Sequence, residues 1–217
     1  NYPSLYKAIK RPMKTIRVVA YDCDGVMFDS RQANIAYYSS LLTRFGKPRL
    51  AEDAIEIIQH ETVARSVEFL FRGDSRKDEA LEEAKKIDYR PFLQLMTMEP
   101  ELVETLRALR PGLWTAVVTN RTTTIGPLLR ETGLVEHFDL VVSALDVAIP
   151  KPHPEALQRV AEHFHVQPRQ ILFIGDSDSD QQAAASAGVF FAAYKNPALP
   201  ANFHISNHRQ VLETLKI

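Results

Sequence analysis

Two aspartates separated by one residue are the first side chains in this sequence that could do chemistry. Asp22 and Asp24 stand in the run Asp-Cys-Asp-Gly-Val, directly after a short apolar stretch. Alternation along an extended chain sends both aspartates to one side and Cys23 to the other, so we expect Cys23 to be a packing residue. Two carboxylates this close share protons or bind a cation, and a hard, oxygen-liking ion such as Mg²⁺ suits them. The pair could also supply a nucleophile and a general acid/base, although Asp-X-Asp-Gly is common in solvated turns as well.

A second acidic group follows another apolar run much later in the chain. Residues 175–180 read Gly-Asp-Ser-Asp-Ser-Asp. We expect Asp176 to lie at a strand tip facing the site. Asp180 falls four residues further on, in the first turn of a predicted helix, where a negative charge is favoured by the helix dipole. Asp178 is expected to be exposed and outside the site, and either serine could cap the helix.

Two further segments carry polar side chains that could hold a phosphate group. Thr119 and Asn120 follow a predicted strand and offer a hydroxyl, an amide and backbone N–H groups, although a simple turn explains this pair equally well. Lys151 stands among prolines that restrict the backbone, and an ammonium group there would attract phosphate and keep Asp22 ionised. The alternative is a surface lysine in a proline-rich loop. His153, in the same loop, is expected to be a loop or packing residue.

Short apolar runs rich in β-branched residues precede each of these groups, and helical patterns separate the runs. This alternation predicts an α/β fold with a doubly wound parallel sheet. Open sheets of this kind bind ligands at the carboxyl ends of their strands, where the candidate residues fall. The predicted strands are 15–21, 115–119, 140–142, 171–174 and 189–194, and the predicted helices are 101–110, 125–131, 154–164 and 181–187.

One segment breaks the alternation, because residues 30–98 contain no convincing strand. They predict helices at 33–45, 52–71 and 76–87 instead, punctuated by glycines and prolines. The simplest organisation is an α/β core formed by residues 14–29 and 99–217, with an all-helical insert at 30–98. Hinges are expected near residues 29–30 and 98–100.

Composition excludes several classes of protein. The 217 residues are 45% hydrophobic and 24% charged, and the formal net charge of -1 offers no global positive field for nucleic acid. No apolar run approaches the roughly 20 residues of a membrane-spanning helix. The single cysteine rules out a disulfide within the chain and a cysteine-rich zinc site. The apolar run before Asp22 is too short for a signal peptide, so we expect a cytoplasmic protein. Its oligomeric state is not indicated by the sequence.

Taken together, the four groups resemble the motifs of the haloacid dehalogenase superfamily of phosphohydrolases. Asp22 to Val26 is similar to the first motif, Thr119-Asn120 to the second, Lys151 with its prolines to the third, and residues 175–180 to the fourth. The third and fourth motifs resemble the phosphoglycolate-phosphatase-like branch. The resemblance covers residues 14–29 and 99–194, and it implies a Rossmann-like core. The helical insert is similar to the type-1 helical cap of this family, which closes over the site and contacts the leaving group.

The resemblance implies a role for each of the acidic residues. Asp22 would attack phosphorus and form an aspartyl-phosphate, and Asp24 would protonate the leaving oxygen and then activate water. Mg²⁺ would be bound by Asp22, the backbone carbonyl of Asp24 and Asp176. Asp24 also favours phosphoryl transfer over carbon–halogen cleavage, because dehalogenases usually lack this second aspartate.

Four more residues receive supporting roles from the same resemblance. Thr119 and Lys151 would hold the phosphoryl oxygens, with Asn120 supporting them from the same loop. Asp180 would orient Lys151 or metal-bound water. The implied cofactor is Mg²⁺, and the implied partner is a small phosphorylated metabolite rather than nucleic acid or a membrane.

Three alternatives to a phosphatase stay open. A phosphosugar mutase would return the phosphoryl group to its substrate, and a non-catalytic binding protein would use the same scaffold without turnover. A phosphonate hydrolase needs an imine-forming lysine in the insert, but Lys77, Lys85 and Lys86 belong to a charged stretch that we expect to be solvated. Arg65 and Arg72 could reach a second anionic group of a substrate, although solvated positions on a helix explain each of them more simply.

Overall fold

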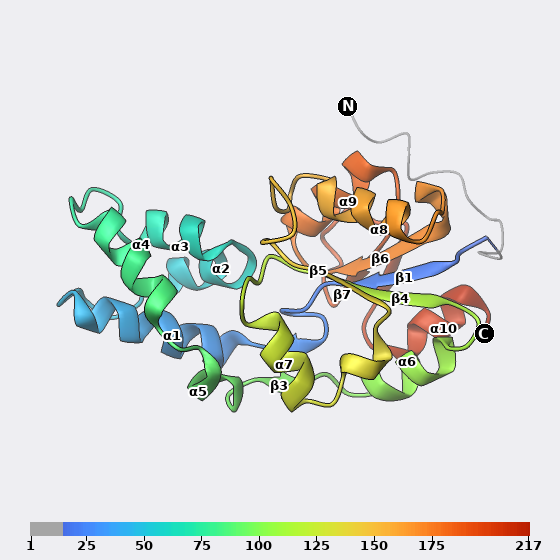
Figure 1. The fold of residues 1–217 in the computed structure, drawn as a ribbon, viewed down its shortest axis with the longest axis horizontal. Helices are drawn as coiled ribbons and strands as arrows, with labels where there is room; N and C mark the ends of the chain where they lie inside the picture. The colour runs from blue at the N-terminus through green and yellow to red at the C-terminus, as the bar shows by residue number, and fades with distance from the viewer. Residues whose placement is uncertain (1–14) are drawn as a thin grey trace.

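The computed structural model describes residues 15–217, and its centre is a six-stranded parallel sheet (Figure 1). The predicted boundary at Lys14 lies outside the described residues. The strand order is β5-β4-β1-β6-β7-β8, and every neighbouring pair is parallel, so the predicted α/β class is confirmed. The strands are β1 (Val18–Tyr21), β4 (Trp114–Val118), β5 (Leu140–Val142), β6 (Ile171–Gly175), β7 (Phe190–Tyr194) and β8 (Phe203–Ile205).

Strand β1 is continuously apolar because both of its faces are covered. Val18 and Ala20 pack into one hydrophobic core, whereas Val19 and Tyr21 pack into the other, and none of the four is exposed. Buried parallel strands typically have this composition. Figure 1 shows the covering helices above and below the sheet. Helices α8 (Glu155–His163) and α9 (Asp178–Ala187) cover one face, and α6 (Leu102–Leu109), α7 (Ile125–Glu131) and α10 (Arg209–Leu215) cover the other.

The three central strands bring their carboxyl ends to the same edge of the sheet. Tyr21 in β1 is level with Val117 in β4 and with Ile174 in β6. The chain places β4 on one side of β1 and β6 on the other, so β1 lies at the switch point where doubly wound sheets form a crevice. The residues that follow these strands therefore meet in one place.

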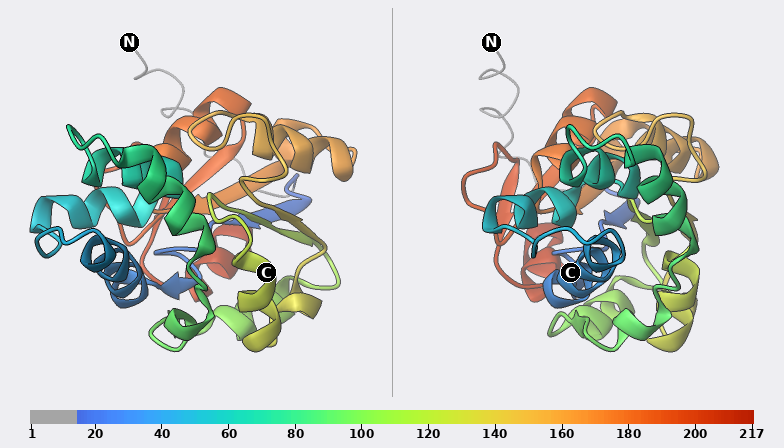
Figure 2. Two further views of the ribbon diagram at one scale, coloured as in Figure 1. Left: turned by 60° about the vertical axis from the view of Figure 1, so that its left-hand side comes forward. Right: turned by 90° about the vertical axis from the view of Figure 1, so that its left-hand side faces the viewer.

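Five helices lie between the short strands β2 (Phe28–Asp29) and β3 (Thr97–Met98), which pair antiparallel. We call residues 31–93 the helical segment. Figures 1 and 2 show its first four helices at one end of the molecule, beyond the carboxyl ends of the sheet strands. Its helices are α1 (Arg31–Arg44), α2 (Glu52–His60), α3 (Val63–Leu70), α4 (Lys77–Lys86) and α5 (Arg90–Leu93).

Two expectations for this part of the chain were wrong. The single helix predicted over 52–71 is broken into α2 and α3, because Glu61 is extended and the Thr62 hydroxyl accepts a hydrogen bond from the Arg65 backbone N–H at 3.3 Å. Threonine is a favourable N-cap, so a new helix begins there. The expectation of no strand over 30–98 fails at Thr97–Met98, since a two-residue strand has no alternating pattern to detect.

Aromatic side chains hold the helical segment together. Tyr37 lies 4.8 Å from Tyr38 and 5.2 Å from Tyr89 between ring centroids, and it contacts Phe92 at 5.8 Å. The Tyr37 hydroxyl donates to the Ala84 carbonyl at 2.8 Å and so ties α1 to α4. These buried rings give a small helical unit apolar area that its short helices could not supply alone.

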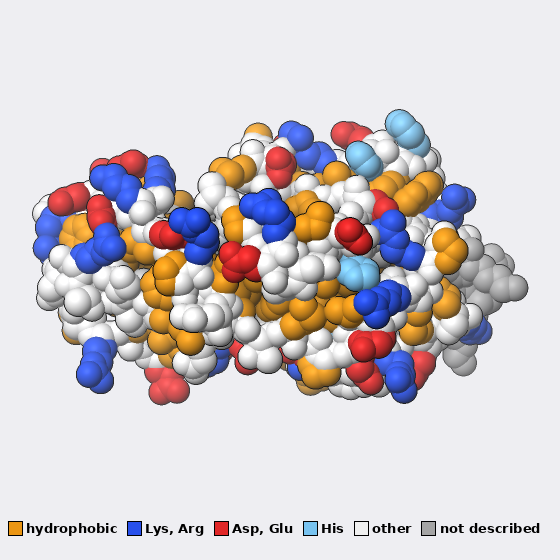
Figure 3. Space-filling model, turned by 60° about the horizontal axis from the view of Figure 1, so that its bottom comes forward, with side chains coloured by type: hydrophobic (Ala, Val, Ile, Leu, Met, Phe, Trp, Pro, Cys, Tyr) orange, Lys and Arg blue, Asp and Glu red, His pale blue; other side chains and the backbone are white. Residues whose placement is uncertain are grey.

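The space-filling view shows positive and negative side chains interspersed on one face, with hydrophobic side chains between the two ends of the molecule (Figure 3). No single-sign field covers this face. Within residues 15–217, none of the helices is both long and apolar enough to cross a membrane.

His208 connects the carboxyl-terminal helix to the loop that carries Asp22 and Asp24. Its Nε2 donates to the Val26 carbonyl at 2.9 Å, and its ring stacks on Tyr194 with 4.8 Å between centroids. The side chain is fully buried, and its Nδ1 has no hydrogen-bond partner among the described residues. Burial lowers the pKa of His208 to about 4, so the imidazole is neutral in the folded protein at neutral pH.

This buried histidine predicts acid sensitivity. Between the unfolded pKa of about 6.5 and the folded pKa of about 4, the unfolded chain binds a proton that the folded chain does not. The contribution of His208 to the free energy of unfolding is therefore fully present above pH 6.5 and is lost as the pH falls toward 4. We expect a contribution of about 2 kcal/mol to the loss in unfolding free energy between pH 7 and pH 5.

Denaturant unfolding at both pH values measures this contribution. His208→Phe keeps the ring stacking and should flatten the pH dependence by that amount, whereas the exposed His163→Gln should leave it unchanged. Equal pH dependence in wild type and His208→Phe would contradict the assignment.

Candidate active site

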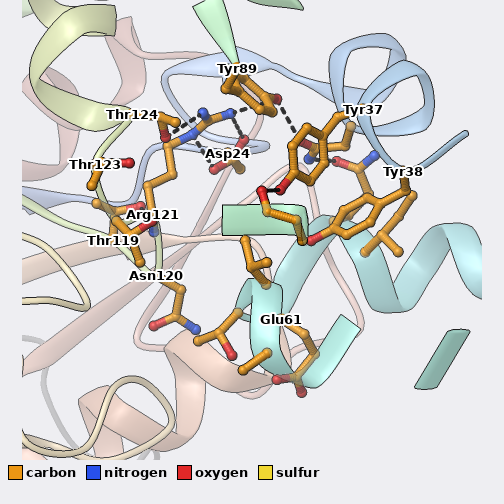
Figure 4. Close-up of a pocket in the computed structure, with 18 of the residues that line it drawn as sticks. Asp24, Tyr37, Tyr38, Glu61, Tyr89, Thr119, Asn120, Arg121, Thr123 and Thr124 are labelled. Atoms are coloured by element: carbon orange, nitrogen blue, oxygen red, sulfur yellow. Dashed lines mark hydrogen bonds and ion pairs between the residues drawn. The ribbon is translucent and has the colours of Figure 1, made fainter. Parts of the chain in front are cut away.

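A cavity of about 450 Å³ lies between the carboxyl ends of the central strands and the helical segment. Five of the residues singled out in the sequence line it, and they come from the ends of β1 and β4 and from the loop before α8. The opposite wall is formed by α1, α2, α4 and the residues around Tyr89 (Figure 4). The five lining residues are Asp22, Asp24, Thr119, Asn120 and Lys151.

The base of this site is a buried cluster of three charges. Lys151 Nζ donates to Asp22 Oδ1 at 2.7 Å and to Asp180 Oδ1 at 2.6 Å. The exposed fractions are 7% for Asp22, 5% for Lys151 and 0% for Asp180. Removing one partner of a buried ion pair typically destabilises a protein by roughly 3–5 kcal/mol, so the three residues hold each other in place.

Lys151 uses all three of its N–H donors inside the protein. The third reaches the Val118 carbonyl at the end of β4, at 3.1 Å. Asn120 supports the same loop, because its Nδ2 donates to the Lys151 backbone carbonyl at 3.1 Å. Lys151 is therefore fixed and buried, which excludes the alternative of a surface lysine in a proline-rich loop. A phosphoryl oxygen would have to share or replace one of its hydrogen bonds.

The cluster shifts the pKa of its members. Burial raises the pKa of Asp22 to about 7, and the nearby Asp180 adds to the rise, although Lys151 opposes it. Burial alone would lower the pKa of Lys151, but Asp180 and Asp22 outweigh it and raise the pKa, so the ammonium stays charged. Burial and then Asp180 also raise the pKa of Asp176 well above its usual value. Such shifts concentrate where charges are arranged for chemistry or for a bound ion.

The geometry around Asp176 fits a divalent cation. Carboxylate oxygens of Asp22, Asp176 and Asp180 lie within 4.8 Å of one another, and Asp176 Oδ1 is buried without a hydrogen-bond partner among the described residues. Gly25, with a φ of +75°, leaves room for this carboxylate, since a Cβ there would lie 1.9 Å from Asp176 Oδ2. An uncompensated buried oxygen beside a second carboxylate is the donor set that Mg²⁺ prefers.

Asp180 differs from the other two carboxylates because its oxygens are already occupied. Oδ1 accepts from Lys151, while Oδ2 accepts from the Ser177 hydroxyl at 2.7 Å and from the backbone N–H groups of Asp176 and Ser177. Ser177 in turn caps α9, which begins at Asp178 and therefore three residues before its predicted start at 181. This pattern supports an orienting role for Asp180 rather than direct contact with a cation. Asp178 is exposed, as expected.

The sequence analysis missed a charged residue that contacts Asp24. The Arg121 side chain is 7% exposed and forms two hydrogen bonds with Asp24, from Nε at 2.8 Å and from Nη2 at 2.7 Å (Figure 4). Alternation offered a signal, since Arg121 stands two positions after Thr119, as Asp24 stands two after Asp22.

Several other candidates lie outside the cavity. Cys23 is fully buried in the hydrophobic core, which confirms that it is a packing residue. The His153 side chain is 42% exposed and does not line the cavity. Arg65 is exposed and approaches Glu61 at 3.9 Å, and Arg72 stacks on Phe69, so neither reaches the site in this structure.

Comparisons with known proteins identify the family of this chain. Residues 19–194 match the family model described as haloacid dehalogenase-like hydrolase. The phosphoglycolate phosphatase of Nitrosospira multiformis is 31% identical over 190 residues, which cover 82% of this chain and 84% of that protein. The phosphoglycolate phosphatase of Escherichia coli O157:H7 is 31% identical over 198 residues, which cover 80% of this chain and 79% of that protein.

Solved structures show the same fold. A hydrolase of this superfamily from Geobacter sulfurreducens has a TM-score of 0.81 and 41% identity, covering 91% of this chain and 98% of that one. β-Phosphoglucomutase from Clostridium difficile has a TM-score of 0.79 at 19% identity, covering 93% of this chain and 97% of that one, and shows the fold alone. This chain belongs to the haloacid dehalogenase-like hydrolases, in the branch that resembles phosphoglycolate phosphatases. The predicted phosphatase class of enzyme is confirmed by these relatives.

The cation fit predicts a metal-dependent change in stability. A ligand that binds only the folded state at 100 times its Kd stabilises a protein by about 2.7 kcal/mol, so Mg²⁺ should raise the Tm of the wild type. Asp176→Asn should abolish most of this rise. Asp178→Asn, two residues away and exposed, should retain it. Thermal unfolding with EDTA and with increasing Mg²⁺ measures the effect, and an equal rise in both variants would place the ion elsewhere.

Proposed function

We propose that this protein is a Mg²⁺-dependent phosphatase that hydrolyses a small phosphorylated metabolite through an aspartyl-phosphate on Asp22. The observation that carries the proposal is the position of Asp22. Its carboxylate lies at the base of the cavity, bound to Lys151 and within 4.8 Å of the carboxylate of Asp176. The same proposal assigns the protein to the cytoplasm.

In the first half of the reaction, a carboxylate oxygen of Asp22 attacks phosphorus and the bond to the leaving oxygen breaks. Asp24 gives its proton to that oxygen, so the product leaves as an alcohol. In the second half, water gives a proton to Asp24 and attacks phosphorus, and the bond between phosphorus and Asp22 breaks. Inorganic phosphate leaves, and both aspartates return to their starting states.

Charge stabilisation comes from groups that surround the transferred phosphoryl group. Mg²⁺, held by Asp22, Asp176 and the Asp24 backbone carbonyl, would supply the positive charge that this reaction needs when bound. Lys151 and Thr119 would hold the phosphoryl oxygens, with Asn120 supporting the lysine loop through its bond to the Lys151 carbonyl. Asp180 would keep Lys151 oriented.

The helical segment and the residues that flank it would form the cap of this site. The cap would comprise residues 30–98, and the core would comprise residues 14–29 and 99–217. Residues of α1, α2 and α4 line the same cavity as Asp22 and Asp24. Closure of such a segment excludes water and selects the leaving group. The two chain segments that link the core to the cap pair with each other as the antiparallel strands β2 and β3. The expected hinges, near residues 29–30 and 98–100, lie at the ends of these strands.

Relatives named as phosphoglycolate phosphatases make phosphoglycolate the first substrate to test. Of the three lysines that a phosphonate hydrolase could use, only Lys85 lines the cavity. It is more than half exposed and forms an ion pair with Glu82 at 2.6 Å, a solvated setting unlike the desolvated pocket in which a lysine is activated for imine formation. This arrangement favours phosphate esters.

Phosphate release from a panel of metabolites tests the proposal. The panel contains phosphoglycolate, sugar phosphates, nucleotides and pyrophosphate, each with Mg²⁺ and with EDTA. We expect release with Mg²⁺ only. Asp22→Asn should reduce kcat by at least about 1,000-fold, because the attacking carboxylate is lost. Asp178→Asn should keep its activity.

Other outcomes have distinct meanings. Retained activity in Asp22→Asn would exclude the aspartyl-phosphate, and equal release in EDTA would exclude the metal dependence. Conversion between sugar-phosphate isomers without phosphate release would identify a mutase. Absence of any turnover would favour a binding protein.

A further inference from the structure

Arg121 and Asp24 form a further buried ion pair, separate from the pairs of Lys151, and the proposed mechanism does not explain it. Both residues line the cavity, and their side chains are 7% and 15% exposed. The guanidinium group contacts both carboxylate oxygens through a two-bond fork. Bidentate pairs of this kind fix the plane of the carboxylate as well as its position.

The rest of the guanidinium group is held equally closely. Nη1 donates to the Thr124 hydroxyl at 3.2 Å, and Nη2 lies 3.4 Å from the Tyr89 hydroxyl. The guanidinium also lies over the Tyr89 ring at 5.0 Å from its centroid. Arg121 therefore has a defined orientation, unlike a surface arginine that samples many rotamers.

Tyr89 extends this contact into the helical segment. Its hydroxyl donates to Asn34 Oδ1 on α1 at 2.7 Å, and Asn34 Nδ2 donates to Gln59 Oε1 on α2 at 3.1 Å. Figure 4 shows Arg121 between Asp24 on the sheet side and Tyr89 on the helical side. A continuous set of contacts thus joins Asp24 to the first two helices of this segment.

We propose that Arg121 is the positioning residue for Asp24 and that Tyr89 couples this position to the packing of the helical segment. The inference rests on the proposed function, in which Asp24 exchanges a proton with the leaving oxygen and with water. Each carboxylate oxygen has two lone pairs, so the fork leaves one on each oxygen for that proton. Fixing the carboxylate plane directs the free lone pair into the cavity.

The dependence of the reaction on the leaving group distinguishes positioning from general structural support. Alcohols of ordinary alkyl phosphates leave only with a proton, whereas p-nitrophenolate leaves without one. The kcat/KM value reports the first phosphoryl transfer. In Arg121→Met we expect kcat/KM to fall about 100-fold for glycerol phosphate, but less than about 5-fold for p-nitrophenyl phosphate.

Matched variants sharpen the comparison. Asp24→Asn should show the same selective loss, and the double variant Asp24→Asn/Arg121→Met should lose no more than Asp24→Asn alone, since the two residues act together. Arg121→Lys keeps the charge without the fork and should recover only part of the loss. Tyr89→Phe should show a smaller selective loss. Arg72→Met removes an exposed arginine outside the cavity and serves as the control.

The outcomes separate this inference from the proposed function. Equal losses for both esters, additive losses in the double variant, or an increase in KM at unchanged kcat would overturn the positioning role. If the wild type releases phosphate from no ester, the proposed function and this inference fail together. If Arg121→Met does not fold, as judged by its Tm, Arg121→Lys supplies the same two-ester comparison.

Discussion

Compensation of buried charge is the constraint on which the rest of this structure depends. Asp22, Lys151 and Asp180 come from three separate parts of the chain and are almost completely removed from water. Each would be strongly unfavourable alone, because a buried charge without a partner loses its hydration and gains nothing in return. The end of β1, the loop before α8 and the first turn of α9 must therefore be placed together to within hydrogen-bond distance. The parallel sheet makes this possible by ending its central strands at one edge.

The three ion pairs leave the site with more acidic than basic side chains. Four carboxylates, from Asp22, Asp24, Asp176 and Asp180, face two cations, Lys151 and Arg121. With all four carboxylates ionised, the excess of two negative charges would equal the charge of one divalent cation. Burial is the main cause of the raised pKa values of Asp22 and Asp176, and the neighbouring Asp180 adds to both rises. Asp176 Oδ1, which is buried without a hydrogen-bond partner among the described residues, marks the place where a positive charge is missing. This balance supports the proposed Mg²⁺ site, and a phosphate dianion would then meet a site whose own charge is neutralised.

The residues proposed to act on phosphorus and the cavity wall opposite them belong to different parts of the molecule. The groups proposed to act on phosphorus belong to strand ends and to one short loop, which rigid packing on both faces of the sheet holds in place. The opposite wall of the cavity belongs to the helical segment, whose tyrosines and amides offer neutral contacts. Arg121 lies at the boundary between the two parts, because it contacts Asp24 on one side and Tyr89 on the other. In the proposed mechanism, this division would let the helical segment contact the leaving group while the strand ends act on phosphorus.

The sequence by itself determined the alternating strands and helices as far as residue 194, the helical character of residues 31–93 and the strand-end positions of Asp22, Thr119 and Asp176, because hydrophobic periodicity is a local property. It did not indicate β8 or α10. Thr62 was a local signal as well, and it could have divided the helix predicted over 52–71. Only the tertiary structure decided that Arg121 pairs with Asp24, 97 positions away, and that Lys151 uses all of its donors inside the protein. Partners this distant are selected by how strands, loops and helices close in space, and no spacing along the chain encodes that geometry.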